Sequence, residues 1–105
     1  MPKSQVRTVQ RSLDIHGAFV RRADLSGASL RGANLTGADA TNAIFRDADF
    51  EGALLGGTVL RGADLTGAKN LTIDQLSAAI IDDRTILPGY IDRAKLRGAA
   101  ANARS

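Results

Sequence analysis

Residues 23–67 read ADLSG, ASLRG, ANLTG, ADATN, AIFRD, ADFEG, ALLGG, TVLRG and ADLTG, nine five-residue units without one insertion. Ala stands first in eight of these units, a large apolar residue stands third in eight, and Gly stands last in seven. Looser units extend the period to LDIHG and AFVRR (13–22) on one side and to AKNLT (68–72) on the other. A fixed period over 13–72 is typical of a solenoid rather than of an ordinary globular core.

A period of five matches neither a helix nor a continuous strand. Apolar residues every five positions never form one stripe on a helix, and each glycine would cost a helix about 0.8–1.0 kcal/mol against alanine. Within one unit, however, the first and third residues point to the same side of a short extended segment. The last two residues supply a turn, in which glycine can adopt a positive φ. We therefore expect each unit to form one side and one corner of a coil.

The units fit the motif A(D/N)LXX, and over 13–72 the chain resembles the pentapeptide repeat family. This resemblance implies an all-β solenoid, a right-handed quadrilateral β-helix with four units per coil. Twelve units would make about three coils, a stack about 14 Å tall at the usual strand spacing. Residues twenty apart would then lie above one another. The expected inward ladders are Ile15/Leu35/Leu55, Val20/Ala40/Leu60, Leu25/Phe45/Leu65 and Leu30/Phe50/Asn70. The amide of Asn70 stands where a core side chain belongs, which marks the end of the stack.

Residues 71–76 carry the signals of a helix start. Thr72 and Gln75 fit a capping box, and Leu71 and Leu76 are spaced as a hydrophobic staple. These signals predict a helix over about 73–81. The segment also resembles the C-terminal part of many pentapeptide proteins, which implies that it closes the last coil and can join two subunits. The candidate residues for such a cap or homodimer contact are Leu71, Ile73, Leu76 and Ile80.

The chain divides into four expected segments. Residues 1–12 form a basic N-terminal arm that has three Lys or Arg and no acid, and residues 13–72 form the β-helix. Residues 73–88 form the capping helix and a loop. Residues 89–105, which contain one isolated motif match at 94–98, form a short helix or a flexible tail.

Neither composition nor motifs predict a chemical site. The chain has no Cys, which excludes disulfides and thiolate metal sites. Its only histidine, His16, sits at a predicted corner, and the aspartates at second positions fit turn and surface roles. No nucleophile, base and orienting group converge, so we expect no catalytic residue, no metal, no cofactor and no enzyme. Residues 1–12 lack a signal h-region and no apolar run approaches 18 residues, which favours a cytoplasmic protein without a membrane span.

Apolar residues interrupt the outward second positions and suggest a partner surface. Phe19 and Val59 would share one face, with Asp39 between them, and Leu54 would lie on the neighbouring face. Fourth and fifth positions add Arg21, Arg22 and Arg61 to the face of Phe19 and Val59. A mixed arginine and apolar surface is typical of protein interfaces. The alternatives are scattered surface residues, or a shift of phase that turns Phe19 inward.

These observations favour a non-catalytic scaffold or interaction module that binds another protein, either alone or as a homodimer. A second hypothesis follows from the resemblance, because some pentapeptide proteins mimic DNA and bind DNA gyrase. That mechanism needs a long acidic rod, whereas 13–72 carries six basic and seven acidic residues. The predicted stack is also shorter than a duplex turn of ~34 Å. Nucleic-acid binding by stacking is disfavoured because Tyr90 is the only Tyr or Trp.

Overall fold

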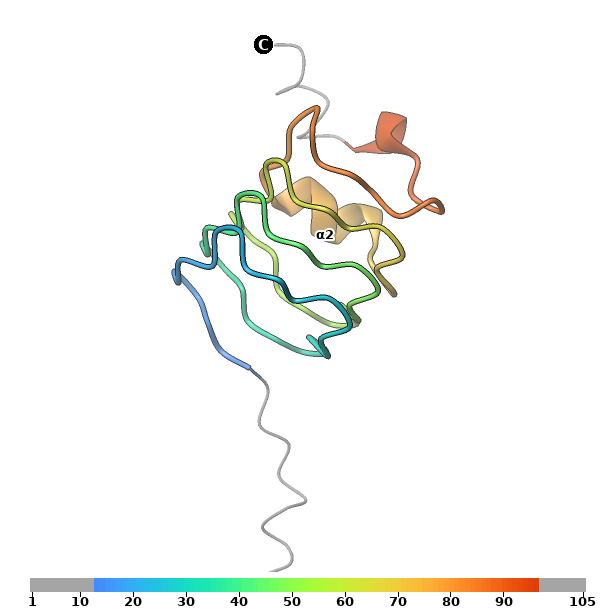
Figure 1. The fold of residues 1–105 in the computed structure, drawn as a ribbon. Coiled ribbons are helices and arrows are strands. Elements are labelled where there is room, and N and C mark those ends of the chain that lie inside the picture. Colours follow the sequence, from blue (N-terminus) through green and yellow to red (C-terminus); the bar gives the residue numbers. More distant parts are fainter. Residues whose placement is uncertain (1–12, 97–105) are drawn as a thin grey trace, which may run out of the picture.

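Residues 13–96 are described by a computed structural model, in which the chain climbs along one axis as a stack of coils (Figure 1). Parallel bridges join neighbouring coils, and all of those within 14–69 link residues twenty apart. Asp14 pairs with Asn34, for example, and Asn34 pairs with Leu54. Twenty residues are four units of five, so the predicted register of the repeat is confirmed.

Backbone hydrogen bonds run both between the coils and around each corner. Leu35 N donates to Leu54 O at 2.9 Å across two coils, while Ala38 N donates to Leu35 O at 2.9 Å and closes a turn within one coil. Fifth-position residues take a positive φ, as in Gly37 at 69° and Asn42 at 60°. Glycine adopts this left-handed conformation without a steric penalty, which explains its place at the end of most units.

The core lies inside the coils and consists of first-position alanines and large third-position residues. From Leu30 to Leu65 every third-position side chain is buried, and the alanine of the second ladder, Ala40, is fully enclosed. The rings of Phe45 and Phe50 meet edge to face with their centroids 5.3 Å apart. The first coil is less enclosed, because Ile15 and its ladder neighbours are only partly buried against this cluster.

One member of the predicted ladders is wrong. Asn70 does not point inward but is exposed, with φ at 61°, and its Nδ2 donates to Asp49 Oδ1 at 2.8 Å. The next residue, Leu71, is buried instead. Burying an amide without a hydrogen-bond partner costs free energy. At the surface the Asn70 amide has a partner, the Asp49 carboxylate.

The helix α2 spans Ile73–Ala78 and begins with the predicted capping box. Gln75 N donates to Thr72 Oγ1 at 3.0 Å, and Thr72 N donates to Gln75 Oε1 at 2.9 Å. The predicted end of the helix at 81 is wrong, because Ala79 is already extended.

After α2 the chain returns to the coil ladder. Ile80 forms a parallel bridge with Val59, and Ile86 forms one with Asp64. The segments AIIDD (79–83) and TILPG (85–89) again place a small and an apolar residue two positions apart, with Arg84 inserted between them. β-Branched isoleucines fit an extended backbone better than a helix, and the free edge beside Val59 supplies the partner. Part of the segment 73–88, where a loop was expected after the helix, therefore pairs with the coil through Ile80 and Ile86.

Residues 90–96 lie over the last coil. They contain a short 3₁₀ helix, η1, at Arg93–Lys95, and Leu96 after it is fully buried. Tyr90 OH donates to Ala68 O at 2.7 Å and accepts from Leu71 N at 3.1 Å. The basic arm 1–12 and the tail 97–105 lie outside the described residues. Within 13–96, no helix is both long and apolar enough to cross a membrane.

Candidate partner-binding face

The ladder brings the predicted surface residues to one side of the coil. Parallel bridges link Phe19 to Asp39, Asp39 to Val59, and Val59 to Ile80. The Phe19 side chain is 80% exposed, so the alternative that it turns inward is wrong. We call this side the Phe19 face; its members are Phe19, Arg21, Arg22, Asp39, Thr41, Asn42, Val59 and Arg61.

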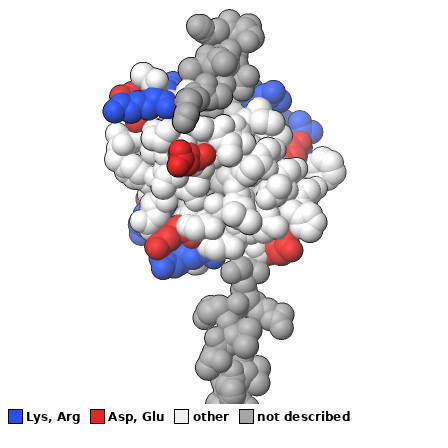
Figure 2. Space-filling view, turned by 180° about the vertical axis from the view of Figure 1, so that it is seen from behind, with Lys and Arg blue, Asp and Glu red and all other residues white. Residues whose placement is uncertain are grey.

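Leu54 lies on the neighbouring side, in the ladder with Asp14 and Asn34, and it is 55% exposed. The corner that follows it is tied to α2, because Gly57 N donates to Ala78 O at 2.8 Å. In Figure 1, α2 lies on the far side of the coil, the side that Figure 2 presents. Figure 2 shows that this side is largely uncharged, with one acidic group inside the uncharged area and the other charged residues near the margins.

Arginines at fourth positions pair with acids eighteen residues later, on the next coil. Arg31 Nη1 lies 3.0 Å from Asp49 Oδ2, and Arg46 Nη1 lies 3.0 Å from Asp64 Oδ2. Arg21 follows the same rule, with its Nε 3.4 Å from Asp39 Oδ2. The position eighteen after Arg61 is the buried Ala79, so this arginine has no acid in the place where the others find one.

Second-position acids hold the corners. Asp39 Oδ1 accepts from Thr41 N at 3.1 Å and from Thr41 Oγ1 at 2.6 Å. Asn34 makes the same backbone contact with Thr36 N at 3.0 Å, so the amide serves as well as the carboxylate. This local bond to the residue two positions on is an Asx turn. It gives these side chains a structural role and explains why either Asp or Asn can stand at the second position of a unit.

Asp49 shows the strongest electrostatic effect of this arrangement. The Asn70 amide, the Glu51 N–H and the Arg31 guanidinium together lower the pKa of Asp49 to about 2. The Thr41 hydroxyl, and after it the Thr41 N–H and the charges of Arg21 and Arg61, lower the pKa of Asp39. Each of these carboxyls is therefore more acidic than in an unfolded chain, where the pKa is about 3.9.

We expect stability to fall in acid because of these carboxylates. Their ionised forms stabilise the folded state above pH about 4, and this contribution is lost as the pH falls towards the folded pKa of Asp49 at about 2. Urea unfolding at pH 7, 4, 3 and 2.5 measures the loss. The Asp49→Asn variant keeps an acceptor at the corner, so its stability should depend less on pH in this range. An unchanged slope in that variant would contradict the role of Asp49.

Arg22 departs from the corner rule. It adopts φ at 61°, a conformation that the neighbouring corners give to Gly17 at 70° and Gly27 at 71°. For a residue with a Cβ, the left-handed region costs about 1–2 kcal/mol. Its long side chain also lacks the local bonding by which Asn or Asp tolerates this region.

Arg22→Gly should therefore stabilise the protein by about 0.5–1 kcal/mol, since the relief of strain exceeds the entropy gained by the unfolded chain. The midpoint of urea unfolding measures the change. Gly27→Ala is the matched control: apart from the adjacent residues of the chain, no atom lies within 4 Å of its added Cβ, yet its φ of +71° should make it destabilising. An Arg22→Gly variant less stable than the parent would show that the arginine side chain has a compensating contact.

The cap residues divide by burial. Leu71 and Leu76 are buried against the end of the repeat core, whereas Ile73 and Ile80 are half-buried. Gln75 ties α2 to the coil, because its Nε2 donates to Phe50 O and to Ala53 O, each at 2.9 Å.

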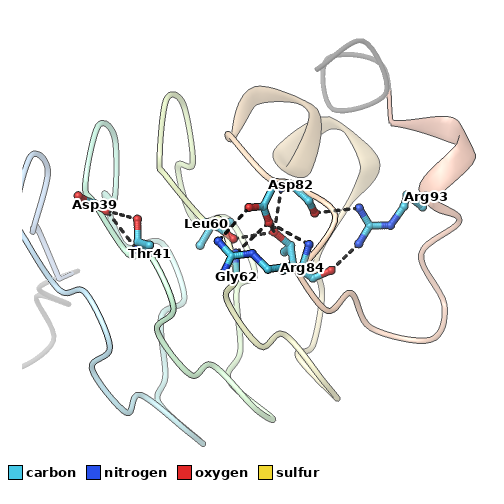
Figure 3. A network of polar contacts seen from close by, with 8 residues as sticks. Asp39, Thr41, Leu60, Gly62, Asp82, Arg84 and Arg93 are labelled. Carbon is cyan, nitrogen blue, oxygen red and sulfur yellow. Dashed lines mark hydrogen bonds and ion pairs between the residues drawn. The ribbon is translucent and has the colours of Figure 1, made fainter. Parts of the chain in front are cut away.

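A polar network at one corner was not predicted from the sequence (Figure 3). Asp82 Oδ1 accepts from Gly62 N and from Arg84 N, each at 3.0 Å. Thr85 Oγ1 donates to Leu60 O at 2.8 Å, and Arg93 donates to the carbonyl oxygens of Asp82 and Thr85. Asp82 followed two residues later by Arg84 repeats the corner pattern of the coil, which is the signal that could have revealed it.

Among residues 13–96, the remaining titratable groups do not gather into a centre. His16 Nδ1 lies 2.7 Å from Asp14 Oδ1, where the carboxylate raises the pKa of the exposed imidazole. In the described part of the chain, no three His, Asp or Glu residues gather in a way that could hold a metal ion.

The family profile for pentapeptide repeats matches this chain in eight copies, over residues 14–47 and 43–72. The chain belongs to the pentapeptide repeat family. Members of this family are generally non-catalytic structural repeat proteins, and their fold is a right-handed β-helix solenoid.

Two solved structures of pentapeptide repeat proteins are similar to this chain. Rfr23 from the cyanobacterium Cyanothece 51142 is 30% identical with a TM-score of 0.64, over 73% of this chain and 52% of Rfr23. A protein from the thylakoid lumen of Arabidopsis thaliana is 29% identical with a TM-score of 0.62, over 94% of this chain and 67% of the other. The chain thus spans about half the length of Rfr23. No protein with a curated description matches it.

Proposed function

We propose that this pentapeptide repeat protein is a non-catalytic interaction or scaffold module that binds another protein through the Phe19 face. The observation that carries the proposal is the 80% exposed Phe19 on a rigid coil, in a column with Val59 and beside three arginines. A large aromatic side chain in water gains free energy when a partner covers it. Arginine and aromatic residues are also enriched in protein interfaces.

The rigidity of the coil favours binding without a conformational change. The side that carries Val59 is bonded to the chain on both sides of it, by Val59 N to Ala38 O at 2.8 Å and Leu60 N to Ile80 O at 2.7 Å. The side that carries Phe19 is bonded to the next coil by Val20 N to Asp39 O and Asp39 N to Ala18 O, each at 2.8 Å. The face is therefore set before a partner arrives, and little ordering cost is left for the binding step.

Site-specific photo-crosslinking in the source organism tests this function. A photoreactive residue at position 19 should give a discrete adduct with one protein, identified by mass spectrometry. The control is position 29, where exposed Ser29 lies on a different side of the same coil. The adduct should weaken when Arg21 and Arg61 are both changed to Glu. Equal adducts from positions 19 and 29 would overturn the proposal.

We also propose that about three coils of repeats are closed at the C-terminal end by α2 and the segment after it. The burial of Leu71, Leu76, Ile81 and Leu96 supports this cap. A homodimer through the same segment would have to use the half-buried Ile73 and Ile80. The molecular mass measured by light scattering at two protein concentrations separates the two. A constant monomer mass would mean that the segment acts only as a cap, and a mass that doubles on concentration would mean that it also forms a dimer.

The DNA-mimic alternative has less support from charge. Residues 13–96 carry nine Lys and Arg against eleven Asp and Glu, and several of the acids are paired with arginines. A gyrase supercoiling assay at micromolar protein distinguishes the functions. Inhibition would favour the mimic, and unchanged supercoiling favours the interaction module.

A further inference from the structure

A surface hollow of about 350 Å³ opens where the corner of one coil meets the next. Its lining consists of Arg21 and Arg22 from one coil and Thr41 and Asn42 from the coil above. The hollow is thus walled by two guanidinium side chains and two neutral side chains able to form hydrogen bonds. None of the four lining residues is an acid.

The corner has more positive charge than its acids neutralise. Arg21 is paired with Asp39, whereas no carboxylate oxygen of residues 13–96 lies within 4.0 Å of the Arg22 or the Arg61 guanidinium. Both Arg21 and Arg61 act electrostatically on the same Asp39 carboxyl. Arg21 and Arg61 therefore share one carboxylate and Arg22 has none within that distance, unlike Arg46, which is paired one-to-one with Asp64.

The contacts of Asp39 go to its own corner and to Arg21, and none goes to Arg22. Its Oδ1 already accepts from the N–H and the hydroxyl of Thr41, and its Oδ2 faces Arg21 Nε at 3.4 Å. The Arg22 side chain thus keeps its donors free of any acid among the described residues. Folding gives no reason for an arginine at this corner, because φ at 61° would suit glycine better.

We infer that this corner is an oxyanion site, in which a phosphate or carboxylate group binds between the side chains of Arg21 and Arg22. The planar guanidinium can donate two parallel hydrogen bonds to such a group. Arg61, two coils or about 10 Å from Arg21, adds positive potential without direct contact. The anion can come from an acidic or phosphorylated side chain of a partner protein, or it can be a free small anion. The first of these sources rests on the proposed function, which the inference then deepens.

Titration of the isolated, full-length protein with pyrophosphate at constant ionic strength tests the site. We expect saturable shifts of the ¹H–¹⁵N NMR signals of Arg21, Arg22, Thr41 and Asn42, including the Nε–H of Arg22. The Arg22→Gly variant suits this corner and should bind at least about tenfold more weakly, the loss expected for a charged hydrogen bond. Arg46→Gln, on another side of the coil and already paired, should bind as the parent does.

A second titration with glutarate identifies the ligand chemistry. Saturation by pyrophosphate alone assigns the site to phosphate groups, and saturation by both extends it to carboxylates. Shifts that rise linearly, that appear equally at Arg31 and Arg46, or that persist in Arg22→Gly would overturn the site. Because no partner is present, saturation here without a crosslink from position 19 would keep the site and remove the protein-binding function. A crosslink without saturation would do the reverse.

Discussion

Replacing Phe45 by alanine is expected to lower the free energy of unfolding by about 3–5 kcal/mol. The Phe45 side chain is fully buried and packs edge to face on Phe50. Its neighbour in the interior, Ala40, is too small to fill the space that the ring would leave. A domain of this size has about 5–15 kcal/mol in total, so the variant should be close to unfolding.

Urea unfolding followed by circular dichroism measures this loss. Phe19→Ala is the matched control, because the same truncation at an 80% exposed side chain should change stability by about 0.5 kcal/mol or less. A loss below about 1 kcal/mol for Phe45→Ala would mean that position 45 is not an interior position of the coil.

Leu76→Ala is expected to cost about 2–5 kcal/mol. Leu76 is the fully buried residue of α2, and with Leu71 it covers the end of the repeat core. A helix of six residues is not stable by itself in water, so α2 depends on this contact. Its loss should also release residues 79–89 from the ladder, which hydrogen exchange at Leu60 and Leu65 would detect as faster rates.

The control for this cap is Leu54→Ala, which removes the same atoms from a side chain that is 55% exposed. We expect a much smaller loss and unchanged exchange at Leu60 and Leu65. If Leu76→Ala and Leu54→Ala were equally stable and exchanged alike, α2 would not act as a cap.

The repeat made most of the fold predictable. An alanine at the first position and a large apolar residue at the third position of each unit show which side chains point inward. Because four units of five residues make one coil, residues twenty apart lie above one another. Phe19, Asp39 and Val59 could therefore be placed in one column by counting in twenties. The corner conformation also followed, because glycine ends most units.

The amide of Asn70 marked the end of the stack, but the repeat could not predict how the chain continues there. Asn70 occupies a third position, but its amide finds Asp49 outside and leaves the interior to Leu71. The helix signal after Thr72 was correct at its start, yet the end of α2 depends on a contact distant in sequence. Ile80 joins the edge at Val59, and only the folded coil offers that edge.

The sequence predicted which residues make up the candidate site, but not how their charges are paired. Counting placed Arg21, Arg22 and Arg61 near Phe19. The pairing of fourth-position arginines with acids eighteen residues later became visible only with the ladder, since it links side chains on different coils. By the same rule the partner of Arg61 would be residue 79. That residue is the buried Ala79, so Arg61 lacks the acid that the other arginines have.

Hydrogen-bond scalar couplings in ²H, ¹³C, ¹⁵N-labelled protein test the central claim most directly, because they detect the coil register atom by atom. We expect couplings from the amide nitrogens of Leu35 and Phe45 to the carbonyl carbons of Leu54 and Asp64, whose oxygens lie 2.9 and 2.8 Å from those nitrogens. Couplings between residues about fifteen or twenty-five apart, instead of about twenty, would contradict the four-unit coil. The residues of the Phe19 face would then not lie on one side of the coil.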